Sequence, residues 1–373
     1  MKHKYIYSFI CLMALALVGT NAQAQNSITV PRAPSPAAEV SQTIGISKVT
    51  VNYSRPFVNG RTGKIWGQLV PYGYTNLGFG NGGNNPWRAG ANENTVITFS
   101  HDVKVEGKDL AVGSYGFHIA VFENGEADII FSENTTSWGS YFYLESEDVL
   151  RVKIKSEENA FTEALTYNFV DVTANSASLT LDWENKRFPI KVAYDVHNIV
   201  VENAKNELRS TASFGFQGPL SAAQYLANNN IQLDQALTWA NQAVALQKNA
   251  NTLGLKGQIL FASNKNDEAY ATMDEMVDHP TAQPNNFYNY GGQLIAQDQD
   301  DKALALFEKM NKRFENNFFA QHGLARAYSA KGNFKKALKY ERMVLSNPSL
   351  PANNGPAIQN FINKLEKGED INP

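Results

Sequence analysis

The stretch SASLTLDWENKRFPIKVAYDVHNIVVENAKNELR, residues 176–209, decides the fold because its apolar period changes within it. Up to Tyr194, apolar and polar residues alternate, as they do where one face of a β-strand is buried. From Asp195 onward the apolar residues recur at three and four positions, which predicts an amphipathic helix over Asp195–Arg209 with Asp195 near its N-cap. The stretch therefore joins a β-domain to a helical domain.

Upstream of this junction, alternation of period two recurs from Gln25 to Tyr194. It is clearest in the set Tyr115, Phe117, Ile119, Val121 and in the set Leu150, Val152, Ile154. Such alternation is typical of antiparallel sheets with one wet face. The pairs Asn59-Gly60, Glu106-Gly107 and Asn124-Gly125 supply turn residues for hairpins. We expect an all-β antiparallel sandwich, jelly-roll-like, over residues 25–209 including its C-terminal helix.

Downstream of the junction the sequence has an internal repeat. Ala269, Ala303 and Ala337 are spaced by 34 residues, and so are Ala223, Gly257, Gly291 and Ala325. This pattern resembles the tetratricopeptide repeat, in which one small residue in each helix lets the two helices of a hairpin pack closely. We expect a linker at 210–219, then an α-helical tetratricopeptide-like solenoid at 220–373 with about four units and a closing helix at Ala357–Lys367.

The first 24 residues read as a signal peptide. Lys2, His3 and Lys4 form a basic start, Tyr5–Val18 is apolar, and Ala22-Gln23-Ala24 has the small-x-small pattern of a cleavage site. We expect cleavage near Ala24 and a periplasmic or secreted mature chain without a transmembrane segment. The single cysteine, Cys11, lies inside the apolar run, so the mature chain has no thiol for disulfides or for cysteine-ligated metal.

Composition and motifs exclude several function classes. Lys+Arg number 33 against 36 Asp+Glu, a net charge of −3, and no local basic run provides the patch that nucleic-acid binding needs. The run Gly78–Gly83 formally matches GxGxxG, but Asn84-Asn85-Pro86 follows it instead of a helix. His101 and His118 are candidate metal ligands together with Glu93 if they lie on adjacent strands, yet a lone strand histidine is more often a hydrogen-bonded surface residue. We expect no metal and no cofactor.

A loop-rich run, Ser54–Glu93, concentrates the candidate binding groups of the β-domain. Guanidinium groups beside aromatic faces suit a carboxylate, a phosphate or a sugar. The alternative is that the arginines brace long loops by pairing with carboxylates and backbone carbonyls. The predicted ligand-binding residues are Arg55, Arg61, Trp66, Tyr72, Trp87, Arg88, Asn92 and Glu93.

Several phrases in this domain resemble the uncharacterised secreted family called domain of unknown function 2911. They include SPAAEVSQTIG (35–45), YSRP (53–56), WRAGANE (87–93), ITFSHDVKVEGK (97–108) and GSYGFHI (113–119), in that order. The resemblance covers most of 25–192. It implies export from a Gram-negative bacterium, and some members carry a helical repeat tail. It implies no activity, substrate or cofactor.

The first helix of each repeat predicts an inner groove suited to an extended peptide. Its polar and aromatic positions are Asn251, Gln258, Phe261, Asn285, Tyr288, Phe319, His322 and Arg326. The alternative is that this groove packs against the β-domain of the same chain.

These features predict an exported, non-enzymatic binding or scaffold protein. The β-domain loops would bind a small molecule, a glycan or another extended ligand, and the repeats would recruit a protein or peptide. One alternative is a cell-envelope hydrolase of glycan or peptide, with Glu93 as general base and Arg88 or Asn92 stabilising negative charge. A second alternative is a purely structural module.

Overall fold

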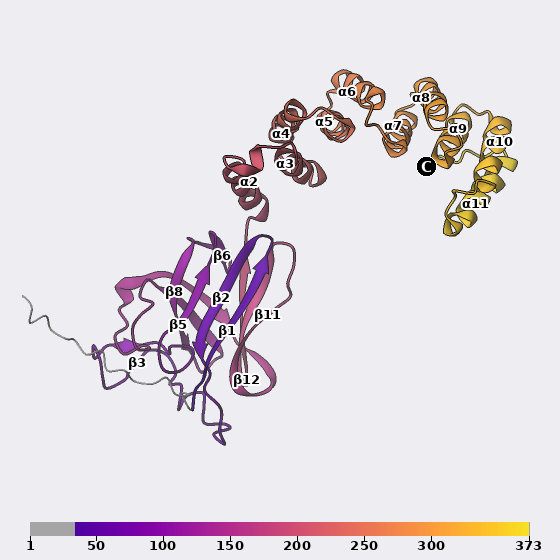
Figure 1. Cartoon of the computed structure of the whole chain (residues 1–373). Helices are drawn as coiled ribbons and strands as arrows, with labels where there is room; N and C mark the ends of the chain where they lie inside the picture. The colour runs from indigo at the N-terminus through magenta and orange to yellow at the C-terminus, as the bar shows by residue number, and fades with distance from the viewer. Residues whose placement is uncertain (1–33, 373) are drawn as a thin grey trace, which may run out of the picture. The chain divides into compact units, whose positions relative to one another are not determined.

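The computed structural model describes residues 34–372. The predicted signal peptide, Cys11 and the cleavage site near Ala24 lie outside the described residues. The chain divides into two compact units that meet between Ile199 and Val200. Strands make up the first unit and helices the second, as the labels of Figure 1 show.

The larger sheet of the first unit has six antiparallel strands in the order β1-β2-β5-β8-β9-β10. Its strands pair in register along most of their length, with Ile97 opposite Tyr115 and Phe117 opposite Phe131. Strand β10 forms one edge of this sheet. The bounds are β1 Ala37–Ile44, β2 Ser47–Ser54, β5 Thr95–Phe99, β8 Gly113–Val121, β9 Glu126–Ser132 and β10 Asp148–Lys155.

A second antiparallel sheet has four strands in the order β11-β12-β6-β7. The turn between β6 and β7 contains Glu106 and Gly107, both with positive φ, 48° and 77°, as a type I′ hairpin turn requires. The bounds are β6 Val103–Val105, β7 Lys108–Leu110, β11 Glu157–Val170 and β12 Ser176–Ala193. Two short strands, β3 Thr75–Asn76 and β4 Asn84–Asn85, pair in the loop region, and a 3-10 turn, η1, spans Glu145–Glu147.

Buried residues of the two larger sheets form one hydrophobic core, because each strand turns its apolar face inward. Ile97, Phe117 and Ile129 come from the six-stranded sheet, and Leu181 and Phe188 from the four-stranded one. The antiparallel all-β prediction is therefore confirmed. In the six-stranded sheet, the strands lie side by side in the order in which they occur along the chain, and β3, β4, β6 and β7 belong to other sheets. The jelly-roll-like detail stays a prediction.

The second unit consists of helical hairpins. Helices α3 with α4, α5 with α6, α7 with α8 and α9 with α10 pack as pairs, and α11 packs on α10. The predicted tetratricopeptide-like solenoid with four units and a closing helix is confirmed. The bounds are α2 Val196–Glu207, α3 Gln217–Asn228, α4 Leu233–Leu246, α5 Ala250–Ala262, α6 Asn266–Asp278, α7 Pro284–Ala296, α8 Asp300–Arg313, α9 Phe318–Ala330, α10 Phe334–Leu345 and α11 Gly355–Glu366.

The repeated small residues lie where the helices of a hairpin meet. Ala269, Ala303 and Ala337 are fully buried. At Gly291 a Cβ atom would lie 2.3 Å from Phe307 Cζ, and at Gly323 it would lie 2.2 Å from Phe307 Cδ1. The ring of Phe307 therefore needs glycine at both positions. Of the two, Gly291 belongs to the 34-residue series, and its close contact explains why that position holds a small residue.

The predicted helix at the junction is α2, and Asp195 lies at its start, where its Oδ1 accepts a hydrogen bond of 3.3 Å from the Asn198 amide. Val196 and Ile199 pack against the β core, whereas Val201 belongs to a cluster with α3, α4 and α5. The division between the two compact units falls inside α2. The stretch 210–219, predicted as a linker, holds the 3-10 turn η2, Thr211–Ser213, and the first residues of α3.

Among the described residues, no helix is long and apolar enough to cross a membrane.

Candidate functional site

The loops of the β-domain enclose a cavity of about 740 Å³. Of the eight residues predicted to bind a ligand there, four line it: Arg61, Trp87, Arg88 and Asn92. The other four, Arg55, Trp66, Tyr72 and Glu93, are not among its lining residues. A cavity of this size matches the range of small-molecule sites in proteins.

Three tryptophans form one wall of this region. The ring of Trp87 stacks on that of Trp183 with centroids 5.9 Å apart and an angle of 19°, and both rings line the cavity. Trp66 lies edge-on to both, 5.9 Å from each. Two backbone hydrogen bonds with Ile119 of β8, 2.9 and 2.8 Å long, fix the Trp87 loop to the sheet. These bonds and ring contacts hold the aromatic wall against the sheet.

The arginines that line the cavity also brace its loops. Arg88 donates from Nη1 to the carbonyl of Asn92, and its guanidinium lies over the ring of Tyr141 at 5.0 Å. Arg61 donates to the carbonyls of Val58 and Phe57 at 2.9 and 2.6 Å. Each guanidinium carries five N–H donors, so these bonds leave further donors on both residues.

Arg55 has a bracing role away from the cavity. Its Nε donates to the carbonyl of Leu165 at 3.0 Å and its Nη2 to Thr166 Oγ1 at 2.7 Å, which ties its loop to β11. The bracing alternative thus describes Arg55 well, whereas Arg61 and Arg88 both brace loops and line the cavity.

The hydrolase alternative assigned roles to Glu93, Arg88 and Asn92. The amide of Asn92 donates to the carbonyl of Ser35 at 3.1 Å, and Arg88 Nη1 donates to the carbonyl of Asn92. Glu93 is half-buried and does not line the cavity. The geometry of the described residues therefore gives this reaction no support.

Two buried donors at the cavity were missed from the sequence. Trp183, 1% exposed, and Asn85, 3% exposed, both line it, and neither Trp183 Nε1 nor Asn85 Nδ2 has a hydrogen-bond partner among the described residues. Trp66 Nε1 lacks one as well. A buried donor without an acceptor costs about 1 to 3 kcal/mol. Sequence alternation placed Trp183 in the core and gave no sign that it borders a cavity.

His118, on β8, lies behind the cavity wall. Its Nδ1 is 3.1 Å from the hydroxyl of Ser140, which lines the cavity, and its ring is 5.4 Å from that of Tyr143. Burial, helped by the positive charge of Arg88, lowers the pKa of His118 to about 3. His101 bonds instead to Ser100 at 3.0 Å, and no cluster of three metal-ligating side chains occurs among residues 34–372.

Six of the eight predicted groove residues of the repeats fall into two places. The first is a series of rings: Tyr288 stacks on His322 at 5.8 Å, and His322 stacks on Phe361 of α11 at 5.3 Å. Phe319 contacts Tyr288 at 5.4 Å, and the guanidinium of Arg326 lies over the Tyr288 ring at 5.5 Å.

The second place is a cavity of about 320 Å³ lined by Asn251 and Gln258 of α5. Met273 and Met276 of α6 also line it. Phe261 is absent from this lining and packs instead against Tyr270 at 5.2 Å, and Asn285 is exposed at the start of α7. The predicted groove is therefore a cavity of mixed amide and apolar lining at one end and packed rings at the other.

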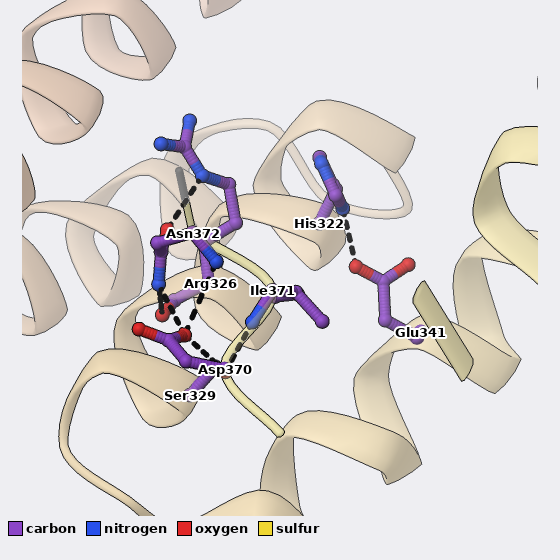
Figure 2. A network of polar contacts seen from close by, with 7 residues as sticks. All are labelled: His322, Arg326, Ser329, Glu341, Asp370, Ile371 and Asn372. Carbon is purple, nitrogen blue, oxygen red and sulfur yellow. Dashed lines mark hydrogen bonds and ion pairs between the residues drawn. The ribbon is translucent and has the colours of Figure 1, made fainter. Parts of the chain in front are cut away.

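A buried carboxylate lies beside the rings. Glu341 of α10 is fully buried, its Oε1 pairs with His322 Nδ1, and its Oε2 has no partner among the described residues (Figure 2). The repeat signature did not predict this pair, because Glu341 reads as an ordinary helix-surface residue in the sequence.

The comparison with known families concerns the β-domain. Residues 35–192 match the model of a family described as "Protein of unknown function (DUF2911)". This match confirms the resemblance seen in the sequence, and its limits lie close to those of the strands, residues 37–193. No curated protein matches the chain.

Several solved structures are similar to the chain. One is YrrB, described as a tetratricopeptide-repeat protein with an unusual peptide-binding site, at 18% identity over 45% of this chain and 88% of that one, with a TM-score of 0.32. A second is the C-terminal part of a tetratricopeptide-repeat protein from Cytophaga hutchinsonii, at 16% identity over 46% and 68%, with a TM-score of 0.37. A third is MamA, at 18% identity over 39% and 85%, with a TM-score of 0.34.

Proposed function

We propose that this protein is an exported, non-enzymatic binding protein that holds a small ligand in its β-domain and a polypeptide partner on its helical repeats. The observation that carries the proposal is the 740 Å³ cavity, whose lining combines the stacked residues Trp87 and Trp183 with the guanidinium-bearing residues Arg61 and Arg88.

The chemistry of this cavity favours a ligand rich in hydrogen-bond acceptors. The two arginines supply positive charge and fork-shaped donors. The Trp87 and Trp183 rings offer an apolar wall for a flat or cyclic body. A carboxylate-bearing or hydroxyl-bearing ring of about the size of a sugar fits this combination.

A binding assay with defined compounds tests this part of the proposal. Carboxylates, phosphates, sugars and sugar acids would be screened by thermal shift on the full mature chain, and the dissociation constant of each hit measured by calorimetry. Trp87→Ala removes the aromatic wall and should weaken a true ligand by about tenfold or more. Tyr72→Ala, at an exposed ring outside the cavity, is the matched control. If no compound class stabilises the chain, this part is wrong.

The second part of the proposal concerns the repeats. The cavity at Asn251 and Gln258 combines amide groups, which bond to main-chain groups of an extended peptide, with flexible methionine side chains that adapt to its side chains. A peptide array probed with the full chain tests it. Gln258→Ala should weaken a bound peptide, whereas Lys335→Ala, at an exposed position of α10, should not.

Export is proposed from the basic start, the apolar run and the Ala22-Gln23-Ala24 site. Expression of the whole chain in a Gram-negative host, followed by fractionation and N-terminal sequencing, tests it. A mature chain that begins at Gln25 outside the cytoplasm supports export. An uncleaved chain in the cytoplasm contradicts it.

A further inference from the structure

The last described residues, Glu369–Asn372, form no helix or strand and lie along helix α9. Ser329 donates from its hydroxyl to Asp370 Oδ1 at 2.6 Å and accepts a bond of 3.1 Å from the Ile371 amide. Asn372 bonds to Arg326 twice: its Oδ1 accepts from Arg326 Nε at 3.0 Å, and its Nδ2 donates to the Arg326 carbonyl at 3.0 Å. Figure 2 shows this network.

Between the two polar contacts an apolar side chain is inserted. Ile371 is 6% exposed and belongs to a cluster with Ala325 of α9, Ala337 of α10 and Leu365 of α11. Three consecutive residues therefore make three different contacts: a carboxylate with a hydroxyl, an aliphatic side chain with an apolar cluster, and a carboxamide with a guanidinium and a carbonyl. A surface that makes a different contact with each successive residue of a polypeptide selects that polypeptide by its sequence.

The same contacts reach the predicted groove. The Arg326 guanidinium that bonds to Asn372 also covers the ring of Tyr288. Gly292 of α7 leaves space for this guanidinium, because a Cβ atom at position 292 would lie 3.2 Å from Arg326 Nη1. Arg326 thus connects the tail to the series of rings.

We propose that Asp370–Asn372 is a built-in ligand of the repeats, and that a partner polypeptide with an acidic, an aliphatic and an asparagine residue in succession binds α9 in its place. This inference rests on the proposed function, since it names the chemistry of the polypeptide that the repeats recognise. It also implies that the tail restrains binding until a partner displaces it.

The occupant is a partner and not the tail of a second copy. A tethered segment competes at an effective concentration in the millimolar range, so a free segment must make additional contacts to displace it. The tail of another copy makes the same three contacts, so it gains nothing over the tethered segment that it would have to displace. A partner chain that continues past Arg326 toward Tyr288 gains the contact area of the rings.

The test uses a labelled peptide with the sequence of residues 367–373, KGEDINP, and fluorescence anisotropy. The full chain with Asp370→Ala and Asn372→Ala, whose tail is released, should bind the peptide saturably, and about tenfold or more tighter than the unaltered chain. Adding Arg326→Ala should weaken that binding again by about tenfold. The peptide KGEAIAP should not bind.

Three results would overturn the inference. One is the absence of saturable binding both by the released-tail chain and by a chain lacking residues 369–373, with helical circular dichroism retained, because the tail is then only a cap. Another is a concentration-dependent dimer of the unaltered chain that the two tail substitutions abolish, because copies then exchange tails. The third is equal peptide binding with and without Arg326→Ala. If array peptides bind through Gln258 while KGEDINP does not bind, the proposed function stands and this inference alone fails.

Discussion

The guanidinium of Arg88 lies over the ring of Tyr141, with Cζ 5.0 Å from the ring centroid, in a space that exists because residue 139 is glycine. A Cβ at Gly139 would lie 2.2 Å from that same Cζ. Together with the bond from Arg88 to the carbonyl of Asn92, this packing holds two loops of the cavity against each other.

Replacing Arg88 by alanine should therefore lower the stability of the β-domain. The Asn92 carbonyl loses its donor and the Tyr141 ring loses its cover, at a cost of about 1 to 3 kcal/mol. Chemical denaturation of the full chain, followed by tryptophan fluorescence, measures it. Lys153→Ala, which removes an exposed positive side chain of β10, is the control and should change stability by less than about 0.5 kcal/mol. An unchanged midpoint for Arg88→Ala would show that the brace is without effect.

Acid should destabilise the β-domain through His118. Burial, with a contribution from Arg88, lowers its pKa from 6.5 to about 3 in the folded chain. Between these values the unfolded chain binds more protons, so stability is complete above about pH 6.5 and decreases as the pH falls, by about 1.4 kcal/mol per pH unit. The neutral variant His118→Gln removes this dependence. Denaturation of both chains at about pH 7.5 and pH 4.5 should show the unaltered chain losing about 3 kcal/mol more than the variant.

Other groups titrate in the same range, so the difference between the two chains is the quantity that matters. If the unaltered chain and His118→Gln lose the same free energy of unfolding between the two pH values, His118 accepts a proton freely in the folded state.

Glycine at position 323 should be required for the repeats to pack. In Gly323→Ala the new Cβ would meet the buried ring of Phe307 at 2.2 Å, so overpacking of about 1 to 3 kcal/mol outweighs the gain in helix propensity. Gly355→Ala is the matched control, because φ is −51° and no atom lies within 4 Å of its Cβ position. Pro356 follows it and makes helical dihedral angles less favourable for a residue with a Cβ, which offsets the entropic gain. Gly355→Ala should therefore change the stability by less than about 0.5 kcal/mol. Thermal unfolding followed at the helical circular dichroism band distinguishes the two sizes of effect.

Removing His322 alone should lower the free energy of unfolding more than replacing both His322 and Glu341. In His322→Ala the fully buried carboxylate of Glu341 keeps no partner for either oxygen, at a cost of about 3 to 5 kcal/mol. The double variant His322→Ala/Glu341→Met removes the buried charge and should recover a large part of that loss. A double-mutant cycle by denaturation measures the coupling. If the two single losses simply add, the pair makes no energetic contribution.

The strands and repeats were predictable because each depends on a period that the sequence carries. Alternation in β2 and β8 reflects burial of one face, and the 34-residue spacing of small residues reflects close helix packing around side chains such as Phe307. The junction was harder to locate. Val196, Ile199 and Val201 share one helical pattern, yet they pack into different cores, and no local signal separates them.

The candidate sites were predictable only in part, since a site depends on which elements meet. Arg61, Trp87, Arg88 and Asn92 line the predicted cavity. Trp183 reads as a core residue in any strand pattern, and only tertiary packing puts it beside the cavity. The tail residues Asp370–Asn372 have no periodicity, and their contacts with Arg326 and Ser329 depend on tertiary packing that the repeat spacing does not show.

Strand β10 ends the six-stranded sheet, and its outward positions carry Arg151, Lys153 and Lys155 between Leu150, Val152 and Ile154. An edge strand offers unpaired main-chain groups to any other strand, and closely spaced positive charges repel an identical edge. The alternating positive residues that identify β10 in the sequence therefore also protect its edge from pairing with another copy. At high concentration the β-domain should stay free of the edge-to-edge stacking that starts amyloid growth, and replacing Lys153 and Lys155 with threonine would remove that protection.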